Sequence, residues 1–503
     1  MNNKKSRLPM LMLVIMFSKL IGMLRDFVLA KYYGTSSVSD AYFIASSVPT
    51  LLFYFIGHSL ATVYIPMYNK VKYENGEKKA LEFSGNIVNI SLILGLIIVA
   101  VLMIFPEYVI KLFASGFDTE TSSLASVFIR ICAPSILMMI LIYVFSGYLQ
   151  ANNSFLPPAA VSLPRNIVIM MSIIIASKIG NMYLGIGLIV SYMAELLMLI
   201  PFIIKKGYKY KPIVNLKDEN IKKSIYMIMP ILLGVSVGQI NKIIDRSIAS
   251  YASTGGVSAL SYASVINNAV QEVFVTGIIT VLFANCAQMV AAGDFDGVKT
   301  KFIKTADMMI FVLIPASVGI VVLAKPIVEI CFSRGNFNSE SVSITSGALR
   351  CYTLGLVFLA LRDTMVKIFY AYKNTHITTI TSVIAVLINI ILNLILYKII
   401  GINGLAIATS ISAMFNCVML SFMLKKIMKD WENKVLFPVI LKSTISALIM
   451  GITVYYLNKK VSSGFVGLFI CIIVGCAIYA TISVVIKNPA VKDFINKAKK
   501  ERL

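Results

Sequence analysis

Histidine and nucleotide-binding glycine loops are scarce or absent in this sequence, and each shortage argues against a class of function. Only two histidines occur, and the seven cysteines show no metal-ligand spacing, so no metal site is expected. No Gly-rich loop of the Walker type is present, which argues against direct use of ATP. No Ser/His/Asp arrangement occurs in a credible context. We therefore expect no catalytic residues, no cofactor, and a protein that is not an enzyme.

Charge is also sparse. Only 14% of the residues are charged and 58% are hydrophobic, with a mean hydropathy of +0.84, whereas a soluble domain has about 25% charged residues. So apolar a chain needs a lipid bilayer as its solvent. Net charge is +23, but the basic residues lie mostly in short loops between apolar segments. Membrane topology explains that pattern better than nucleic-acid binding does.

The apolar segments predict an all-α polytopic membrane protein. A membrane-spanning helix needs about 20 mostly apolar residues, and fourteen such segments follow one another along the chain. We expect the spans at 8–32, 38–68, 84–105, 123–150, 157–178, 183–204, 224–250, 257–290, 304–325, 343–371, 377–398, 403–424, 436–457 and 464–486.

Basic residues in the loops predict the orientation. With the N-terminus in the cytoplasm, the cytoplasmic segments hold 28 Lys and Arg residues and the outer segments hold 8. Cytoplasmic loops carry such an excess in most membrane proteins. The bias predicts an even number of spans, both termini in the cytoplasm, and a Lys-rich link at 205–223 that attracts anionic lipid headgroups.

Two related halves flank this link. An almost constant offset of 220 to 221 residues aligns one half with the other, pairing Tyr42 with Tyr262, Phe117 with Phe337, Glu120 with Glu340, Arg130 with Arg350, and Asn153 with Asn374. We expect a six-helix lobe at 1–204, the linker at 205–223, a second six-helix lobe at 224–426, and two extra helices with a basic tail at 427–503. An even-span repeat predicts a pseudo-two-fold axis along the membrane normal, with the substrate site between the lobes.

Charges inside the predicted spans indicate what that site binds. Ten basic residues but only about five acids fall within spans, and a charge at mid-bilayer costs roughly 2.5–3.5 kcal/mol on insertion scales. Most of them must therefore face a wet cavity or an acidic partner. The surplus of positive charge predicts a cavity for an anion, and arginine presents a fork that fits phosphate oxygens.

The first span carries the most informative charges. Ser18 and Arg25 lie on one helical stripe, and Lys19 and Asp26 lie on another. We expect Arg25 to line the cavity rather than to form a purely structural ion pair. The equivalent seventh span carries Asp245 next to Arg246, so each half holds an adjacent acid–base pair deep in its first helix.

Two other groups of charges have simpler explanations. Arg165 lies near a span end and is expected to extend its head toward the interface. Asp363 and Lys367 are spaced i, i+4, and a pair between them is as plausible as a role in the cavity.

Several motifs resemble the bacterial lipid II flippase family (MurJ/MviN), whose superfamily also holds polysaccharide flippases and multidrug exporters. The resembling stretches are Met16–Asp26, Asp40–Phe43, Pro49–Leu52, Pro230–Asn241 and Arg334–Phe337. The resemblance runs from the first span to the last and implies a two-lobed protein that opens alternately to each side. It also implies a hydrophobic groove at the last two helices for a lipid tail, and a role in peptidoglycan synthesis, cell-wall biogenesis and cell shape.

The resemblance assigns roles to individual residues. By resemblance, Lys19 and Arg25 would belong to the cationic substrate site, Asp26 would support it, and Asp40 would lie at the outer gate. The charges inside the spans, rather than the resemblance, add Arg246, Lys242 and Arg362 to this site, with Ser18 and Asp245 in support.

The chain departs from the family at two positions. Phe53 and Tyr54 stand where a basic residue is common, and Ser264 and Val265 stand where Asp-Arg is common.

We therefore expect a flippase that moves undecaprenyl-pyrophosphate-linked peptidoglycan precursor (lipid II) to the outer leaflet of the bacterial cytoplasmic membrane. The membrane potential or a Na⁺ or H⁺ gradient would supply the energy. Expected partners are the lipid-linked anionic substrate, membrane lipids and other cell-wall synthesis proteins, without nucleic acid. The alternatives are a flippase for another polyprenyl-linked saccharide, a multidrug exporter, a membrane-embedded glycosyl or acyl transferase, and a non-transporting scaffold.

Overall fold

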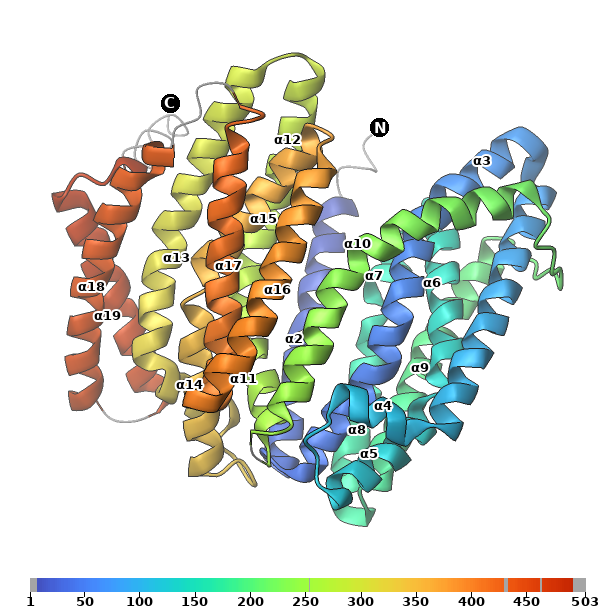
Figure 1. Cartoon of the computed structure of the whole chain (residues 1–503), viewed down its shortest axis with the longest axis horizontal. Coiled ribbons are helices and arrows are strands. Elements are labelled where there is room, and N and C mark those ends of the chain that lie inside the picture. Colours follow the sequence, from blue (N-terminus) through green and yellow to red (C-terminus); the bar gives the residue numbers. More distant parts are fainter. Residues whose placement is uncertain (1–6, 253, 429–432, 462–463, 492–503) are drawn as a thin grey trace. The chain divides into compact units, whose positions relative to one another are not determined.

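The structure is a computed structural model that describes residues 7–252, 254–428, 433–461 and 464–491. These residues form helices and connecting turns without any strand (Figure 1). The chain divides into two compact units. The first comprises residues 1–258 with 334–337, and the second comprises 259–333 with 338–503.

The first unit contains the helices of the N-terminal half and one more. They are α2 (Arg7–Tyr33), α3 (Ser37–Ile104), α4 (Pro106–Phe113), α5 (Thr119–Cys132), α6 (Ser135–Ala151), α7 (Leu156–Ala160), α8 (Ser162–Ile179), α9 (Met182–Lys205) and α10 (Glu219–Ala249).

The remaining helices belong mainly to the second unit. They are α11 (Gly256–Gln271), the π-helix η1 (Glu272–Thr276), α12 (Gly277–Ala291), α13 (Phe295–Phe332), α14 (Ser339–Thr353), α15 (Leu356–Ala371), α16 (Thr375–Ile400), α17 (Ile402–Leu424), the 3₁₀ helix η2 (Asn433–Leu436), α18 (Phe437–Lys460) and α19 (Phe465–Val485). In Figure 1, α18 and α19 lie side by side next to α13, and contacts join all three.

The fourteen expected spans fall on helical segments in the same order, so the prediction of an all-helical polytopic protein is confirmed. By length and hydropathy, the described part of the chain holds nine helices able to cross a membrane, or eleven if each bent pair counts as one span. The second and third expected spans share the single helix α3, which is broken at Gly76. There φ is +83°, a value that glycine adopts at little cost. α3 is therefore a helical hairpin.

Two bent pairs occupy equivalent places in the repeat. α5 and α6 meet at 46°, and α14 and α15 meet at 44°. Pro134 lies at the first break, whereas the second break has Leu354 and Gly355. At the second break, the Ser410 hydroxyl of α17 donates to the carbonyls of Cys351 (2.6 Å) and Tyr352 (3.2 Å). Ser410 thus satisfies backbone groups at the end of α14.

Helix caps repeat as well. Asp118 caps α5 by accepting from the Thr121 amide at 2.7 Å, and Asn338 caps α14 by accepting from the Ser341 amide at 2.8 Å. The hydrogen bond from Thr121 holds the pKa of Asp118 below its usual value. Asp118 and Asn338 lie 220 residues apart, the same offset as the sequence repeat.

The first compact unit extends past the expected first lobe, because it includes α10 and ends at Ser258. α10 packs against α3 and α4, and the Ser250 hydroxyl accepts from the Gly116 amide at 2.8 Å. The predicted six-helix lobes at 1–204 and 224–426 rest on the sequence repeat. They stay a prediction, as does the axis between them.

The basic linker at 205–223 is held against α3. The side chain of Asn86 donates to the Asn215 carbonyl (2.9 Å) and accepts from the Asn215 amide (2.8 Å). One turn further, Asn89 donates to the carbonyls of Lys211 and Ile213. Because Asn86 and Asn89 lie on one face of α3, they fix the linker along that helix.

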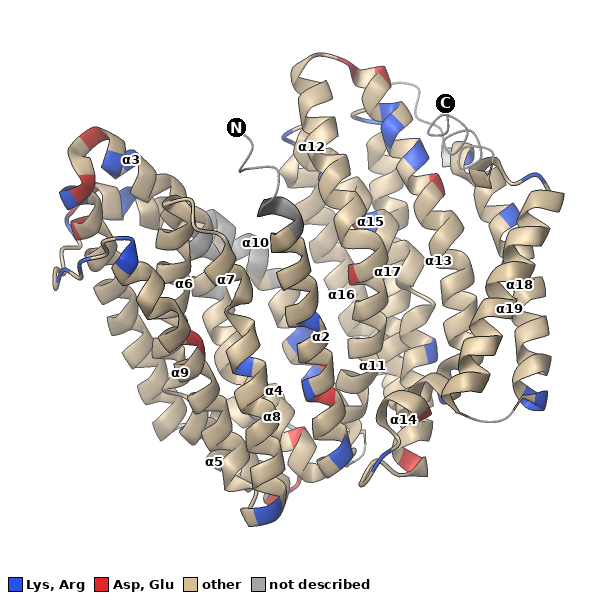
Figure 2. Cartoon of the chain, turned by 180° about the vertical axis from the view of Figure 1, so that it is seen from behind, with Lys and Arg blue, Asp and Glu red and all other residues tan. Residues whose placement is uncertain are grey.

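The exposed faces of several helices are apolar enough to contact lipid. Large apolar side chains are exposed along α9, α16, α18 and α19. In Figure 2 the charged residues gather mainly near helix ends, with few along the middle stretches. A soluble protein rarely leaves so much apolar surface uncovered, and the arrangement matches a multi-span membrane protein.

Candidate functional site

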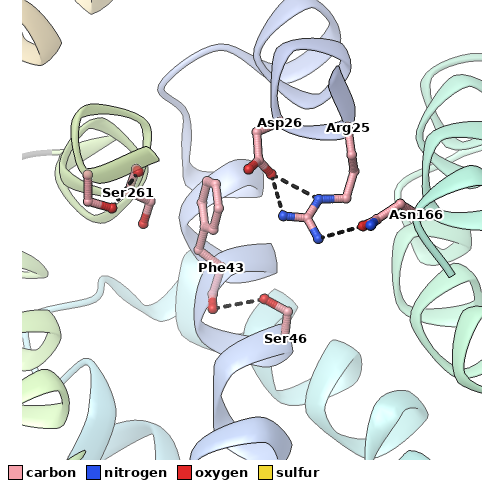
Figure 3. A network of polar contacts seen from close by, with 7 residues as sticks. Arg25, Asp26, Phe43, Ser46, Asn166 and Ser261 are labelled. Atoms are coloured by element: carbon pink, nitrogen blue, oxygen red, sulfur yellow. Dashed lines mark hydrogen bonds and ion pairs between the residues drawn. The ribbon is translucent and has the colours of Figure 1, made fainter. Parts of the chain in front are cut away.

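Arg25 on α2 is the centre of a polar network within the first unit (Figure 3). Its Nε and Nη2 donate to Oδ1 of Asp26 at 2.9 and 2.7 Å, and its Nη1 donates to Oδ1 of Asn166 on α8 at 3.1 Å. Asp26 is buried, whereas 26% of the Arg25 side chain remains exposed. The guanidinium has five N–H groups, so it is oriented by two partners and keeps capacity for an anion.

The other predicted residues of α2 are placed differently. Ser18 is buried, and its hydroxyl finds no hydrogen-bond partner among the described residues. Lys19 follows it at an exposed position of the helix. Ser18 and Lys19 therefore lie about two helical turns before the Arg25–Asp26 pair.

A cavity of about 320 Å³ within the first unit lies among α3, α6, α8 and α9. Phe53, Tyr54 and Arg165 line it, together with Tyr192 and Glu195. Nη1 of Arg165 lies 3.6 Å from Oε2 of Glu195, and its guanidinium lies 5.5 Å from the ring centroid of Tyr192. The expectation that Arg165 extends toward the interface is therefore wrong, because a buried glutamate holds it at a cavity.

This cavity is also where one departure from the family pattern lies, because Phe53 and Tyr54, which stand in place of a common basic residue, line it. Phe53 is buried and packs edge-to-face on Tyr143, with 5.3 Å between the ring centroids. The positive charge in this cavity comes from Arg165 on α8, next in sequence to Asn166, the partner of Arg25. Sequence reasoning did not assign Arg165, Asn166, Tyr192 or Glu195 to a site, since their partners lie on other helices.

Asp40 lies in the first turn of α3 and is almost fully buried. Its carboxylate accepts from the amides of Gly255 (2.8 Å) and Ser258 (2.7 Å) at the start of α11. Gly34 and Gly335 permit further close backbone approaches here: a Cβ on Gly34 would lie 2.4 Å from the Asn336 carbonyl oxygen. Asp40 thus joins the loop before α3 to the loop before α11. The predicted topology places this end of the unit on the outer side of the membrane.

The charged residues of α10 also lie in the first unit. Asp245 accepts from the side chain of Asn241 at 3.1 Å. Lys242 is exposed, whereas Asp245 and Arg246 are half-buried. Of the predicted cationic site, Lys19, Arg25, Lys242 and Arg246 therefore belong to one compact unit.

Arg362 belongs to the second unit and repeats the geometry of Arg25. Its Nε and Nη2 donate to Oδ1 of the adjacent Asp363 at 2.9 and 2.6 Å. Asp363 also accepts from Gln271 at 3.1 Å. The ammonium of Lys367 lies over the rings of Phe283 and Tyr370 at 5.7 and 5.5 Å. The observed ion-pair partner of Asp363 is therefore the adjacent Arg362 and not Lys367. A role of Asp363 in the cavity stays a prediction.

A long apolar groove of about 810 Å³ crosses the second unit. α13, α15 and α18 contribute most of its walls, with lining residues such as Val318, Phe358, Leu448 and Ile452. Its lining suits a hydrocarbon chain. Among the described residues, no group of three or more His, Cys, Asp or Glu could hold a metal ion.

The fold and these buried charges define the class: a polytopic, all-helical membrane protein with the architecture of a transporter. An inward-facing multidrug transporter of the MATE family shares that fold at 14% identity, with a TM-score of 0.69 over 82% of this chain and 94% of that one. A solved lipid II flippase MurJ in an inward closed conformation is 27% identical, with a TM-score of 0.84 over 96% of this chain and 99% of that one.

Sequence comparison gives the family. The profile described as "Lipid II flippase MurJ" matches residues 29–475. The lipid II flippase MurJ of Thermosipho africanus is 30% identical, covering 96% of this chain and 97% of the relative. The probable lipid II flippase MurJ of Thermotoga maritima is 26% identical over 96% of both. The chain belongs to the MurJ lipid II flippase family, which confirms the resemblance seen in the sequence.

Proposed function

We propose that this protein flips lipid II from the inner to the outer leaflet of the bacterial cytoplasmic membrane by alternating access. Family membership over most of the chain supports this function, and the relatives named above carry it in their names. The likeness to an inward closed MurJ structure supports a cycle between inward and outward states. The protein is a transporter and makes or breaks no covalent bond.

The observation that carries the proposal is the Arg25 network. An arginine in the interior of an apolar helix is costly unless it has a function or a partner. Arg25 has a partner in Asp26, 26% of its side chain remains exposed, and its hydrogen bonds to Asp26 and Asn166 use only part of its five N–H groups. In an alternating-access cycle those groups bind the pyrophosphate, with Lys19, Lys242 and Arg246 adding positive charge on the same unit and Arg362 adding it on the second. Asp26 and Asp245 orient the bases, and Asp40 holds the outer gate.

The apolar groove provides a binding site for the hydrocarbon part of the amphiphilic substrate. The polyprenyl chain lies in the groove of α13, α15 and α18 while the headgroup crosses in a polar environment. A Na⁺ or H⁺ gradient or the membrane potential drives the cycle. Phe53 and Tyr54, in place of a base common in the family, favour a second candidate, another polyprenyl-linked saccharide as cargo.

The test replaces the only lipid II flippase of a bacterial cell with this chain. We expect growth with the unchanged chain and loss of growth with Arg25→Ala at equal membrane abundance. Lipid II in the outer leaflet, measured by its cleavage with an enzyme added outside, should fall at least about tenfold, since a charge-assisted contact to the phosphate is lost.

The matched control is Arg130→Ala. Arg130 pairs loosely with Glu107 at 3.8 Å, and both side chains are exposed, so this change should leave growth intact. Correct insertion of the unchanged chain without growth would exclude lipid II as its cargo. Full activity of Arg25→Ala would exclude the proposed site.

A further inference from the structure

A polar pocket of about 760 Å³ lies in the second unit, where α13 and α18 end. Its lining includes three basic residues, Lys325, Arg350 and Lys459, and one acid, Glu329. This end of α13 is the one opposite Lys299–Lys304. The predicted topology therefore places the pocket, which we call the α13–α18 pocket, on the outer side of the membrane.

The positive charges of this pocket are incompletely neutralised. Lys325 lies 3.9 Å from Glu329, and the Lys459 ammonium lies 4.4 Å from the Tyr455 ring centroid. The Arg350 side chain makes no hydrogen bond or ion pair with any residue that the structure describes. Three bases against one acid leave a surplus of two positive charges beside an open volume. Such a surplus attracts an anion, and arginine can bind phosphate oxygens with two parallel hydrogen bonds.

The repeat shows that this surplus is particular to the second half. Arg130 is the equivalent of Arg350, 220 residues earlier and likewise in the last turn of the first helix of a bent pair. Arg130 has Glu107 of α4 as its acidic partner at 3.8 Å. In the second half the acid of this region, Glu329, lies 3.9 Å from Lys325, and Arg350 faces the pocket instead.

The pocket continues into the apolar groove. Val322 and Tyr455 line both. Along α18 the groove runs from Ile440 to Tyr456, about 24 Å at 1.5 Å per residue, which is most of the roughly 30 Å hydrocarbon core. A cationic pocket at the end of an apolar groove of this length fits one molecule with an anionic head and a long hydrocarbon tail.

We propose that the α13–α18 pocket binds the pyrophosphate of the lipid-linked substrate after it has crossed the membrane, while the polyprenyl chain still occupies the groove. This inference rests on the proposed function and adds an outer subsite, separate from the Arg25 network. A pyrophosphate diester carries one negative charge on each phosphorus, which matches the surplus of two. The phosphodiester of a simple phospholipid carries a single charge and matches it less well.

The test measures binding at this pocket alone. A photoreactive phenylalanine analogue replaces Asn458, which lines the pocket, in the full chain held in phosphatidylcholine nanodiscs. The probe is undecaprenyl pyrophosphate, a monoester that carries the same pyrophosphate with at least the two negative charges of the diester. We expect a crosslink whose yield, at subsaturating probe, falls about tenfold or more in the double variant Arg350→Gln, Lys459→Gln, because two charged contacts are lost. Arg130→Gln, the repeat-equivalent control, should leave the yield unchanged.

The groove is tested separately. Ile440 lines the far end of the groove, about 22 Å along α18 from Tyr455, and is 38% exposed, so Ile440→Trp can fill that end of the groove without disturbing the core. It should weaken crosslinking of undecaprenyl pyrophosphate and spare farnesyl pyrophosphate, whose chain is far shorter.

An undiminished yield in the double variant overturns the proposal. So does competition by phosphatidylglycerol as effective as that by unlabelled undecaprenyl pyrophosphate, because the pocket would then be a general site for anionic lipids. A charge-dependent crosslink in a chain that fails to rescue growth supports the pocket and locates the failure in the assignment of lipid II.

Discussion

At the scale of single residues, the two Arg–Asp pairs show how a membrane helix can hold a cation ready for a ligand. Neighbouring side chains on a helix do not face each other, yet Arg25 and Arg362 each fold back so that Nε and Nη2 reach the adjacent carboxylate. The acid compensates the burial of the guanidinium and fixes its plane. The adjacent acid engages one edge of each guanidinium, and Asn166 accepts a further N–H of Arg25, which leaves other N–H groups for a phosphate.

Asp40 gives a prediction for one residue. Its two oxygens each accept an amide N–H, from Gly255 and Ser258. In Asp40→Asn one acceptor becomes a donor, which leaves a buried N–H without a partner at a cost of about 1–3 kcal/mol. Amide hydrogen exchange at Gly255 and Ser258 should accelerate about tenfold or more, because local opening becomes easier.

Asp118→Asn is the matched control for Asp40→Asn. Asn338 already performs the equivalent capping role in the second half, and asparagine and aspartate are similar N-caps. Exchange at Thr121 should therefore change little. Unchanged exchange at Gly255 and Ser258 in Asp40→Asn would refute the proposed tie between the two loops.

Sequence reasoning singled out Arg25 and Asp26 of the candidate network but not their neighbours, for a physical reason. Arg25 and Asp26 stand out because charge inside an apolar run is visible in the sequence itself. Asn166 is 141 positions away from Arg25, and helical spacing carries no information about such a contact. The same limit explains why Arg165 seemed to belong at the interface, since Glu195, its partner, lies on another helix.

At the scale of helices, long apolar runs predicted the segments well, because a bilayer sets their length. Their breaks were harder to predict. Gly76 divides α3 within a polar stretch, where no change in hydropathy marks the turn. Proline marks the bend between α5 and α6, but the equivalent bend between α14 and α15 has none. That bend depends on packing against α17, which the sequence does not reveal.

Gly355 at this second bend gives a prediction for an element. A Cβ added to Gly355 would lie 2.7 Å from Cα and from Oγ of Ser410, so Gly355→Ala must push α17 away. Overpacking of this kind costs about 1–3 kcal/mol. We expect a lower unfolding temperature for purified protein, and weaker protection of the α14–α15 amides.

Gly277→Ala provides the comparison for Gly355→Ala. Gly277 begins α12, and a Cβ there would meet no atom within 4 Å. Replacing glycine by alanine in a helix usually stabilises by about 0.5–1 kcal/mol, so the unfolding temperature should stay level or rise. Equal effects of the two substitutions would mean that close packing does not hold the bend.

At the scale of the whole molecule, the residues predicted to bind substrate fall in two compact units that share repeated features. The Arg25 network belongs to the first unit, and the Arg362 pair, the apolar groove and the α13–α18 pocket belong to the second. Transport by alternating access needs two parts whose relative arrangement changes while each part keeps its own structure. Networks closed within one unit, such as Arg25–Asp26–Asn166, can survive such a change intact.

Orientation gives the last prediction, and the span count decides it. Seven predicted spans separate the linker at 205–223 from Lys460, so the two positions should lie on opposite sides of the membrane. An even number of crossings between them would instead put both on one side. The excess of 28 basic residues over 8 places the linker in the cytoplasm.

An epitope inserted after Lys460 should therefore bind antibody on intact spheroplasts. One inserted after Lys217 should bind only once the membrane is permeabilised. The reverse pattern would invert the topology and move the α13–α18 pocket to the cytoplasmic side, whereas labelling of both epitopes on intact cells would exclude fourteen spans.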